Sequence, residues 1–204
     1  MATFPRGVAV RVWFALAPAI VAVPGSAWAE PHVRNGWYGG IGYGGCWANF
    51  DLIDTDESQW SGTLNLRAGY ALDQDLLLGA EYMRWAKDYE IATLQGDVPV
   101  AVAFSGTVVA VTYFPGNAGF MLRAGLGVAL ADVDVDESPL GAVSVSDIAP
   151  DPGLAAMMAT GYEVRLTTKF ALGADFNVLY LGVKDESIDG AYVYGVNVQF
   201  NWYW

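Results

Sequence analysis

Large apolar side chains fall on every second position over most of this chain, in eight separate runs. Successive side chains of a β-strand point to opposite sides of the sheet, so this alternation is the period of a strand with two different faces. Within the runs, aromatic residues gather toward the ends and aliphatic residues toward the middle. The runs span residues 37–47, 60–70, 76–82, 100–114, 120–130, 154–166, 170–180 and 192–204. The sequence therefore predicts an all-β chain of eight strands.

The face opposite the large apolar side chains is small and polar, with Gly, Ser, Asn, Arg and Glu at its positions. The interior of an eight-stranded barrel has room for little more than side chains, so small residues mark its inside. The bulky apolar face must then point outward, where only lipid suits it. A water-soluble barrel would place these two faces the other way round. The pattern predicts an eight-stranded antiparallel up-and-down transmembrane β-barrel.

The connections between the runs alternate in length, which fits that topology. Three are short and carry turn residues: 71–75, 115–118 and 167–169. Four are longer and polar: 51–59, 87–99, 132–153 and 184–190. Short periplasmic turns and longer extracellular loops are typical of outer-membrane barrels. With an even number of strands, both ends of the barrel are expected on the periplasmic side.

Composition excludes several other classes of protein. Hydrophobic residues make up 54% of the chain and charged residues 16%, yet no unbroken apolar stretch after the first thirty residues is long enough for a membrane-spanning helix. The net charge of −12 argues against nucleic-acid binding, which needs a basic surface. A single cysteine cannot form an internal disulfide.

The first residues are expected to be a cleaved signal peptide over 1–29, followed by one barrel domain over 30–204. Two arginines precede an apolar run over residues 12–23, and small residues flank a cleavage point after Ala29. A membrane anchor or a buried helix is the alternative, but the run is too short to span a bilayer and Pro18 interrupts it. We therefore expect an exported protein.

Three segments carry a resemblance to a known family. They are Gly-Trp-Tyr-Gly-Gly-Ile-Gly-Tyr-Gly at 36–44, Leu-Gly-Ala-Glu-Tyr at 78–82, and the ending Tyr-Gly-Val-Asn-Val-Gln-Phe-Asn-Trp-Tyr-Trp at 194–204. With these segments the chain resembles the small eight-stranded outer-membrane barrels grouped with OmpA, OmpX and the opacity-type porin family. The resemblance implies a location in the cell outer membrane, contact with lipid and lipopolysaccharide, and insertion by the barrel-assembly machinery. The assembly signal would lie in the last strand, at Tyr194, Phe200, Trp202 and Trp204.

Catalytic chemistry is not expected. A hydroxyl nucleophile needs a positioned base, and the only histidine, His32, precedes the first strand. One His and one Cys cannot make a zinc-type site, so neither a metal nor a cofactor is expected. Cys46 is interpreted as a small core residue.

The predicted interior carries three arginines and three acids. They are Arg67, Glu81, Arg123, Glu163, Arg165 and Asp175. Adjacent strands would pair Arg67 with Glu81, Arg123 with Glu163 and Arg165 with Asp175. Two interpretations remain open: an electroneutral plug, because charges buried in a narrow lumen must be paired, or a gate that opens a water path when partners exchange.

The long connections are strongly acidic. One contains Asp132, Asp134 and Asp136, which lack the Gly and the distal Glu of an EF-hand loop. They suit a solvated extension of the fifth strand, or a surface site where Mg²⁺ or Ca²⁺ bridges them to lipopolysaccharide phosphates. The acidic rim argues against heparin-type adhesion.

Two functions remain after these exclusions. The favoured one is a structural and surface-interaction barrel in the Gram-negative envelope, expected to be a monomer. The alternative is a small passive channel that prefers cations. The sequence identifies no ligand or receptor for the loops.

Overall fold

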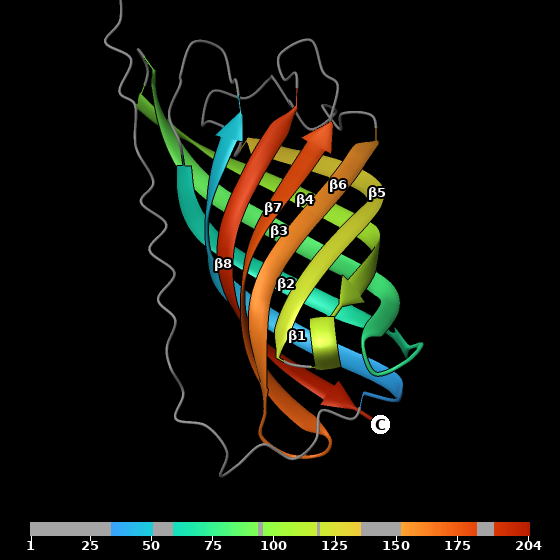
Figure 1. Cartoon of the computed structure of the whole chain (residues 1–204). Coiled ribbons are helices and arrows are strands. Elements are labelled where there is room, and N and C mark those ends of the chain that lie inside the picture. The colour runs from blue at the N-terminus through green and yellow to red at the C-terminus, as the bar shows by residue number, and fades with distance from the viewer. Residues whose placement is uncertain (1–33, 51–58, 94–95, 118, 136–151, 183–189) are drawn as a thin grey trace, which may run out of the picture.

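The computed structural model describes residues 34–50, 59–93, 96–117, 119–135, 152–182 and 190–204. Within these ranges the chain forms eight β-strands and one short 3-10 turn, η1 Pro115–Asn117 (Figure 1). The strands are β1 Gly36–Phe50, β2 Gln59–Ala71, β3 Leu76–Thr93, β4 Gly96–Tyr113, β5 Phe120–Val135, β6 Gly153–Arg165, β7 Phe170–Gly182 and β8 Ala191–Tyr203. The expected signal peptide, residues 1–29, lies outside the described residues.

Each strand pairs antiparallel with the next one along the chain, and β8 pairs with β1 to close the barrel. The closing seam runs from Tyr38 opposite Tyr203 to Phe50 opposite Ala191. The prediction of an eight-stranded antiparallel up-and-down barrel is confirmed. No helix in the described part of the chain is both long and apolar enough to cross a membrane.

The three tight connections lie at one end of the barrel, together with the C-terminus (Figure 1). Side chains fix two of them locally. The Asp73 carboxylate accepts the backbone N–H of Asp75 at 2.8 Å and of Leu76 at 2.7 Å, and the Thr167 hydroxyl oxygen accepts the N–H of Phe170 at 3.0 Å. Such side-chain to backbone hydrogen bonds stabilise tight turns. The short turns are where the sequence predicts them.

The prediction of a long loop over residues 87–99 is wrong. β3 continues to Thr93 and β4 begins at Gly96, so the two strands form one long hairpin whose register runs without interruption from Lys87 opposite Val102 to Thr93 opposite Gly96. The register pairs Tyr89 with Val100 and Ile91 with Val98, so apolar residues recur at every second position there, as in the rest of the hairpin. The acids between them, Asp88, Glu90 and Asp97, give the segment the composition of a loop.

The outer wall of the barrel is apolar. Its large hydrophobic side chains are between 38% and 70% exposed, from Leu64 to Met158. In water this wall would cost free energy in proportion to its area. Aromatic side chains pair near both edges of the band. The pairs are Trp37–Tyr70 at 5.4 Å between ring centroids, Phe170–Trp202 at 5.3 Å, Trp47–Trp60 at 4.4 Å and Tyr180–Tyr192 at 5.0 Å. This is the arrangement of a lipid-facing wall with two aromatic girdles.

One strand has its faces the opposite way from the prediction. The alternate residues of 100–114 are expected outside, yet Phe104 and Val108 are 1% and 3% exposed inside the barrel, and Val109, 63% exposed, faces out. Both faces of β4 are apolar, so alternation alone does not distinguish them. The register does: Val108 lies opposite the inward Glu81, and cross-strand partners share a face.

Candidate functional site: the charged lumen

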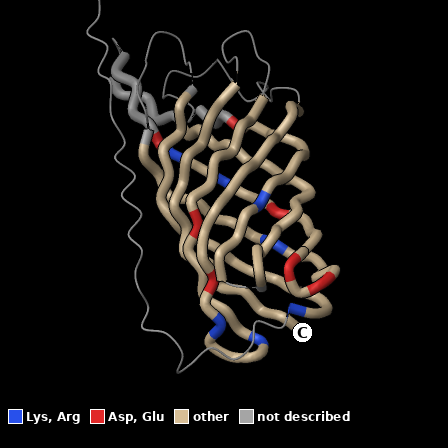
Figure 2. Tube along the Cα trace, in the orientation of Figure 1, with Lys and Arg blue, Asp and Glu red and all other residues tan. Residues whose placement is uncertain are grey.

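The inward side chains form three layers along the barrel axis. A charged and polar layer lies in the middle, an apolar cluster fills the end away from the tight turns, and a second cluster fills the turn end. The cluster at the end away from the tight turns, the upper cluster, includes Trp85 and Phe104, whose ring centroids are 5.5 Å apart. The prediction of a small and polar interior is therefore wrong at both ends of the lumen, because the cluster at the turn end also contains large apolar side chains, Leu77, Phe114 and Met121. Along the strands, Lys, Arg, Asp and Glu are sparse among the other residues (Figure 2).

Arg123 of β5 is the centre of the middle layer. Its Nη1 donates to both carboxylate oxygens of Glu81 on β3, each at 2.7 Å, and its Nη2 donates to Asp175 Oδ2 on β7 at 2.5 Å. All three side chains are at most 2% exposed. One guanidinium thus joins two carboxylates from strands on either side of it, which compensates the cost of burying these charges.

Side-chain amides complete the hydrogen bonding of the two acids. Asn65 donates to Glu81 Oε1, and Gln199 donates to Asp175 Oδ2. Asn197 donates to Asp175 Oδ1 at 3.4 Å. Each oxygen of the two carboxylates therefore accepts at least one hydrogen bond, as buried polar atoms in folded proteins usually do.

Arg67 lies beside this group but makes no ion pair in the described part of the chain. It is opposite Glu81 in the register of β2 and β3, yet its Nε and Nη2 atoms have no hydrogen-bond partner among the described residues. A Cβ on Gly40 would lie 3.1 Å from Arg67 Nε and 2.3 Å from Asn201 Oδ1. Glycine at position 40 therefore gives the guanidinium its place against β1.

Glu163 organises the layer at the turn end. Its carboxylate accepts hydrogen bonds from Tyr203 Oη at 2.8 Å, from Asn201 Nδ2 at 2.8 Å and from Arg34 Nη2 at 3.3 Å. Arg165 Nε lies 3.8 Å from the same carboxylate. Glu163 of β6 thus contacts Arg34, which precedes the first strand, and two residues of the last strand, Asn201 and Tyr203.

Arg34 closes the turn end of the lumen, although it precedes β1. The residue is 1% exposed, and its guanidinium carbon lies 3.4 Å above the centre of the Phe114 ring. Its Nη1 donates to the carbonyl oxygen of Gln74 in the turn between β2 and β3, at 3.3 Å. One side chain therefore connects the start of the barrel, two turns and Glu163.

Replacing Arg34 by Leu should lower the free energy of unfolding by about 1–3 kcal/mol. The substitution removes the stacking on Phe114 and one partner of Glu163, while Tyr203 and Asn201 still donate to that carboxylate. Equilibrium unfolding in urea, in detergent micelles and followed by tryptophan fluorescence, measures the change. A variant as stable as the parent would show that Arg34 is not a structural contact.

The structure places all six predicted charged residues in the lumen but pairs them differently. The predicted pairs Arg123–Glu163 and Arg165–Asp175 are wrong: Arg123 binds Glu81 and Asp175, and Arg165 lies by Glu163. For Arg67 and Glu81 the register is adjacent, as predicted, but the ion pair is not formed in the described residues.

Sequence reasoning missed two members of this network. Tyr203 lies between the outward Trp202 and Trp204, so its inward position follows from the alternation. Arg34 lies outside every alternating run, and nothing in the pattern marks it.

The described residues contain no group of three His, Cys, Asp or Glu that could hold a metal ion. Cys46 is buried in the upper apolar cluster, with its Sγ 3.7 Å from the carbonyl oxygen of Ser61. His32 lies outside the described residues.

The remaining predicted residues lie at the ends of β5 and β8. Asp132 and Asp134 belong to β5, with Asp132 exposed, and Asp136 lies outside the described residues. In β8, Phe200 and Trp202 are 40% and 44% exposed on the outer wall. The outward face also carries Tyr194, and Trp204 exchanges two backbone hydrogen bonds with Trp37, each at 3.0 Å.

Comparison with known proteins gives relatives in structure alone. No family model and no curated protein sequence matches the chain. Among solved structures, Neisserial surface protein A superimposes with a TM-score of 0.57 at 16% identity, over 84% of this chain and 99% of that one. Ail, the attachment invasion locus protein of Yersinia pestis, superimposes with a TM-score of 0.56 at 11% identity, over 82% and 99%. The fold of this chain is that of the small eight-stranded outer-membrane barrels.

Proposed function

We propose that this chain is an outer-membrane β-barrel with a structural role in the Gram-negative envelope, presenting its long connections at the cell surface. The apolar wall with two aromatic girdles supports a place in a bilayer, because only lipid suits such a surface. The likeness to outer-membrane barrels supports the same location. Export by a signal peptide and insertion through the β8 strand complete the proposal.

The observation that carries a structural role over a channel is the filled lumen. Both acids of the middle layer are held by Arg123 and by amides, so neither is left to attract a passing cation. An ion would also have to cross the apolar cluster around Trp85 and Phe104. A hydrophobic constriction of this kind is a barrier to ions. We therefore favour the plug over the gate, although the lumen is not electroneutral as predicted, since Arg34 brings the buried arginines of the described residues to four against three acids.

One structural neighbour bears on a surface-interaction role for this chain. Ail of Yersinia pestis is an attachment protein that was solved with the heparin analogue sucrose octasulfate. The net charge of −12 on this chain would repel such a polyanion. Any partner of the loops is therefore proposed to be neutral or cationic.

Gel mobility and conductance test the proposal together. A closed barrel resists SDS in the cold and migrates differently after boiling, so we expect a heat-dependent shift for the purified outer-membrane fraction. In planar bilayers the same protein should give no reproducible conductance step. A cation-selective step that disappears in Glu81→Gln would establish the channel instead. A heat-insensitive protein in the soluble periplasm would refute the membrane barrel altogether.

A further inference from the structure

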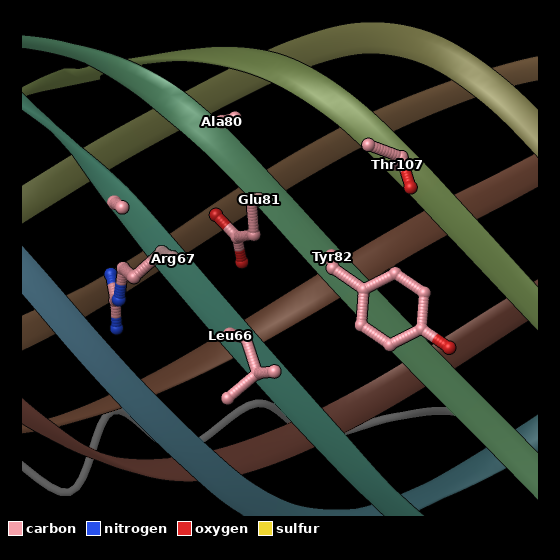
Figure 3. A pocket seen from close by; sticks show the side chains of 7 residues that line it. Leu66, Arg67, Ala80, Glu81, Tyr82 and Thr107 are labelled. Atoms are coloured by element: carbon pink, nitrogen blue, oxygen red, sulfur yellow. The ribbon is translucent and has the colours of Figure 1, made fainter.

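The outer wall of β2, β3 and β4 contains a hollow of about 230 Å³ (Figure 3). Ala68 and Ala80 are cross-strand partners and present only methyl groups, while the larger Leu66 and Tyr82 form the next row toward the long connections. Thr107 of β4 borders the hollow beside Tyr82. The inward residues Arg67 and Glu81 lie at its floor. The hollow therefore opens to the lipid-facing side and is apolar where the two alanines meet.

One positively charged side chain lies on the outer wall next to this hollow, on the side toward the long connections. Arg84 follows Tyr82 by two residues on β3, is exposed, and is the only arginine or lysine at the described outward positions of the strands. Its cross-strand neighbours are Leu64 and Ser105, and no ion pair to it is formed within the described residues. A lipid-facing charge is costly near the middle of a bilayer and is tolerated where its stem reaches the headgroups.

Hydroxyl-bearing side chains lie next to Arg84 on β3 and on the β4 side, whereas its neighbour on β2 is Leu64. In the register, Arg84 lies opposite Ser105, and Tyr82 lies opposite Thr107, so the four residues form one compact block. On β5, the strand next to β4, Leu130 lies opposite Ser105 and Val128 lies opposite Thr107, and both are about half exposed. Tyr82 and Thr107 belong to this block and also line the hollow, so the polar groups and the alanine methyl groups adjoin on one face. A lipid molecule likewise joins a polar headgroup to an apolar chain.

We propose that this block and hollow bind one phosphorylated, acylated glycolipid of the outer leaflet, with a phosphate on Arg84 and an acyl chain in the hollow. Arg84 and Ala80 are four residues apart, about 13 Å along the strand at about 3.3 Å per residue, or about 10 Å along the membrane normal for a strand tilted by about 40°. This is most of the depth of one leaflet, half of an apolar band of about 25 Å. The site rests on the proposed function, because the proposed orientation places the β3 end that carries Arg84 toward the outer leaflet.

Native mass spectrometry of the purified full-length barrel in detergent tests the site, with diphosphorylated lipid A as the probe. We expect one retained lipid A, and about fivefold less retention in Arg84→Gln, since one basic residue at a charged membrane surface contributes about that factor. Ala80→Phe fills the hollow and should lower retention similarly. Arg84→Lys keeps the cation and should stay within about twofold of the parent. Ala174→Phe, at an outward alanine of β7, is the matched control and should leave retention unchanged.

Several results would overturn the site. Equal retention of lipid A from which both phosphates have been removed would exclude the phosphate contact. Equal retention of phosphatidylglycerol would exclude the choice of a glycolipid. Unchanged retention in Arg84→Gln would exclude the residue. Each variant is first checked for the heat-dependent gel shift, so a folded barrel without lipid preference refutes this site alone, whereas a missing shift in the parent refutes the proposed function.

Discussion

Arg123→Ala should lower the free energy of unfolding by about 3–5 kcal/mol, because the substitution leaves two buried carboxylates without a cation. Glu81 and Asp175 are 2% and 0% exposed, and both direct oxygen atoms at the Arg123 guanidinium within 2.7 Å. Their remaining donors are amides, which do not neutralise charge. Urea unfolding in detergent micelles, followed by tryptophan fluorescence and by the fraction that resists cold SDS, measures the loss.

The matched control is Arg67→Ala in the neighbouring strand. Arg67 has a similar burial but no ion pair in the described residues, so its loss should cost at most about 2.5 kcal/mol, since the buried methylenes of its stem contribute about 0.8 kcal/mol each. A second control replaces the charges together, as Arg123→Met with Glu81→Gln and Asp175→Asn. Neutral side chains of similar volume often restore most of the stability lost when a buried ion pair is broken. Equal losses for Arg67→Ala and Arg123→Ala would contradict this account of the lumen.

These arginines show which part of the site the sequence could predict. Alternation placed all six charged residues on inward positions, since a period of two is all that the assignment of a face requires. Their partners depend instead on the width of the barrel. In a lumen this narrow the long guanidinium side chain of Arg123 reaches β3 and β7, each two strands away, rather than β6, which carries Glu163. Pairing between adjacent strands was therefore the wrong rule.

The faces of β4 show a different limit. The rule that large apolar residues face lipid held for seven strands and failed for β4, because the upper lumen is itself filled by large apolar side chains such as Phe104 and Trp85. Where both faces are apolar, the pattern carries no information about direction, and only the register with β3 settles it. Arg34 shows a third limit. It precedes the first strand, so the two-residue alternation of a strand could not predict where its side chain lies.

Gly44→Ala should prevent the barrel from closing, or cost about 3 kcal/mol or more where it closes, at the upper end of what overpacking does. Gly44 lies in the seam between β1 and β8, opposite Asn197. A Cβ at this position would lie 1.9 Å from the backbone carbonyl oxygen of Val196 and 2.7 Å from the Cα of Asn197. Both are backbone atoms of the partner strand, so relief requires β8 to move away from β1. We expect loss of the fast-migrating, SDS-resistant form in unboiled samples.

Gly42→Ala is the control, because Gly42 points into the same lumen from the same strand two residues earlier. A Cβ there would contact Asn65 Cβ and Gln199 Cγ, each at 3.3 Å, and these are side-chain atoms that can shift by a few tenths of an ångström. This variant should keep the cold-SDS form. If both variants fold equally well, the close approach of β1 and β8 at Gly44 is not what requires glycine there. If only Gly44→Ala fails, the close approach of the β8 backbone to β1 at this position is what requires glycine there.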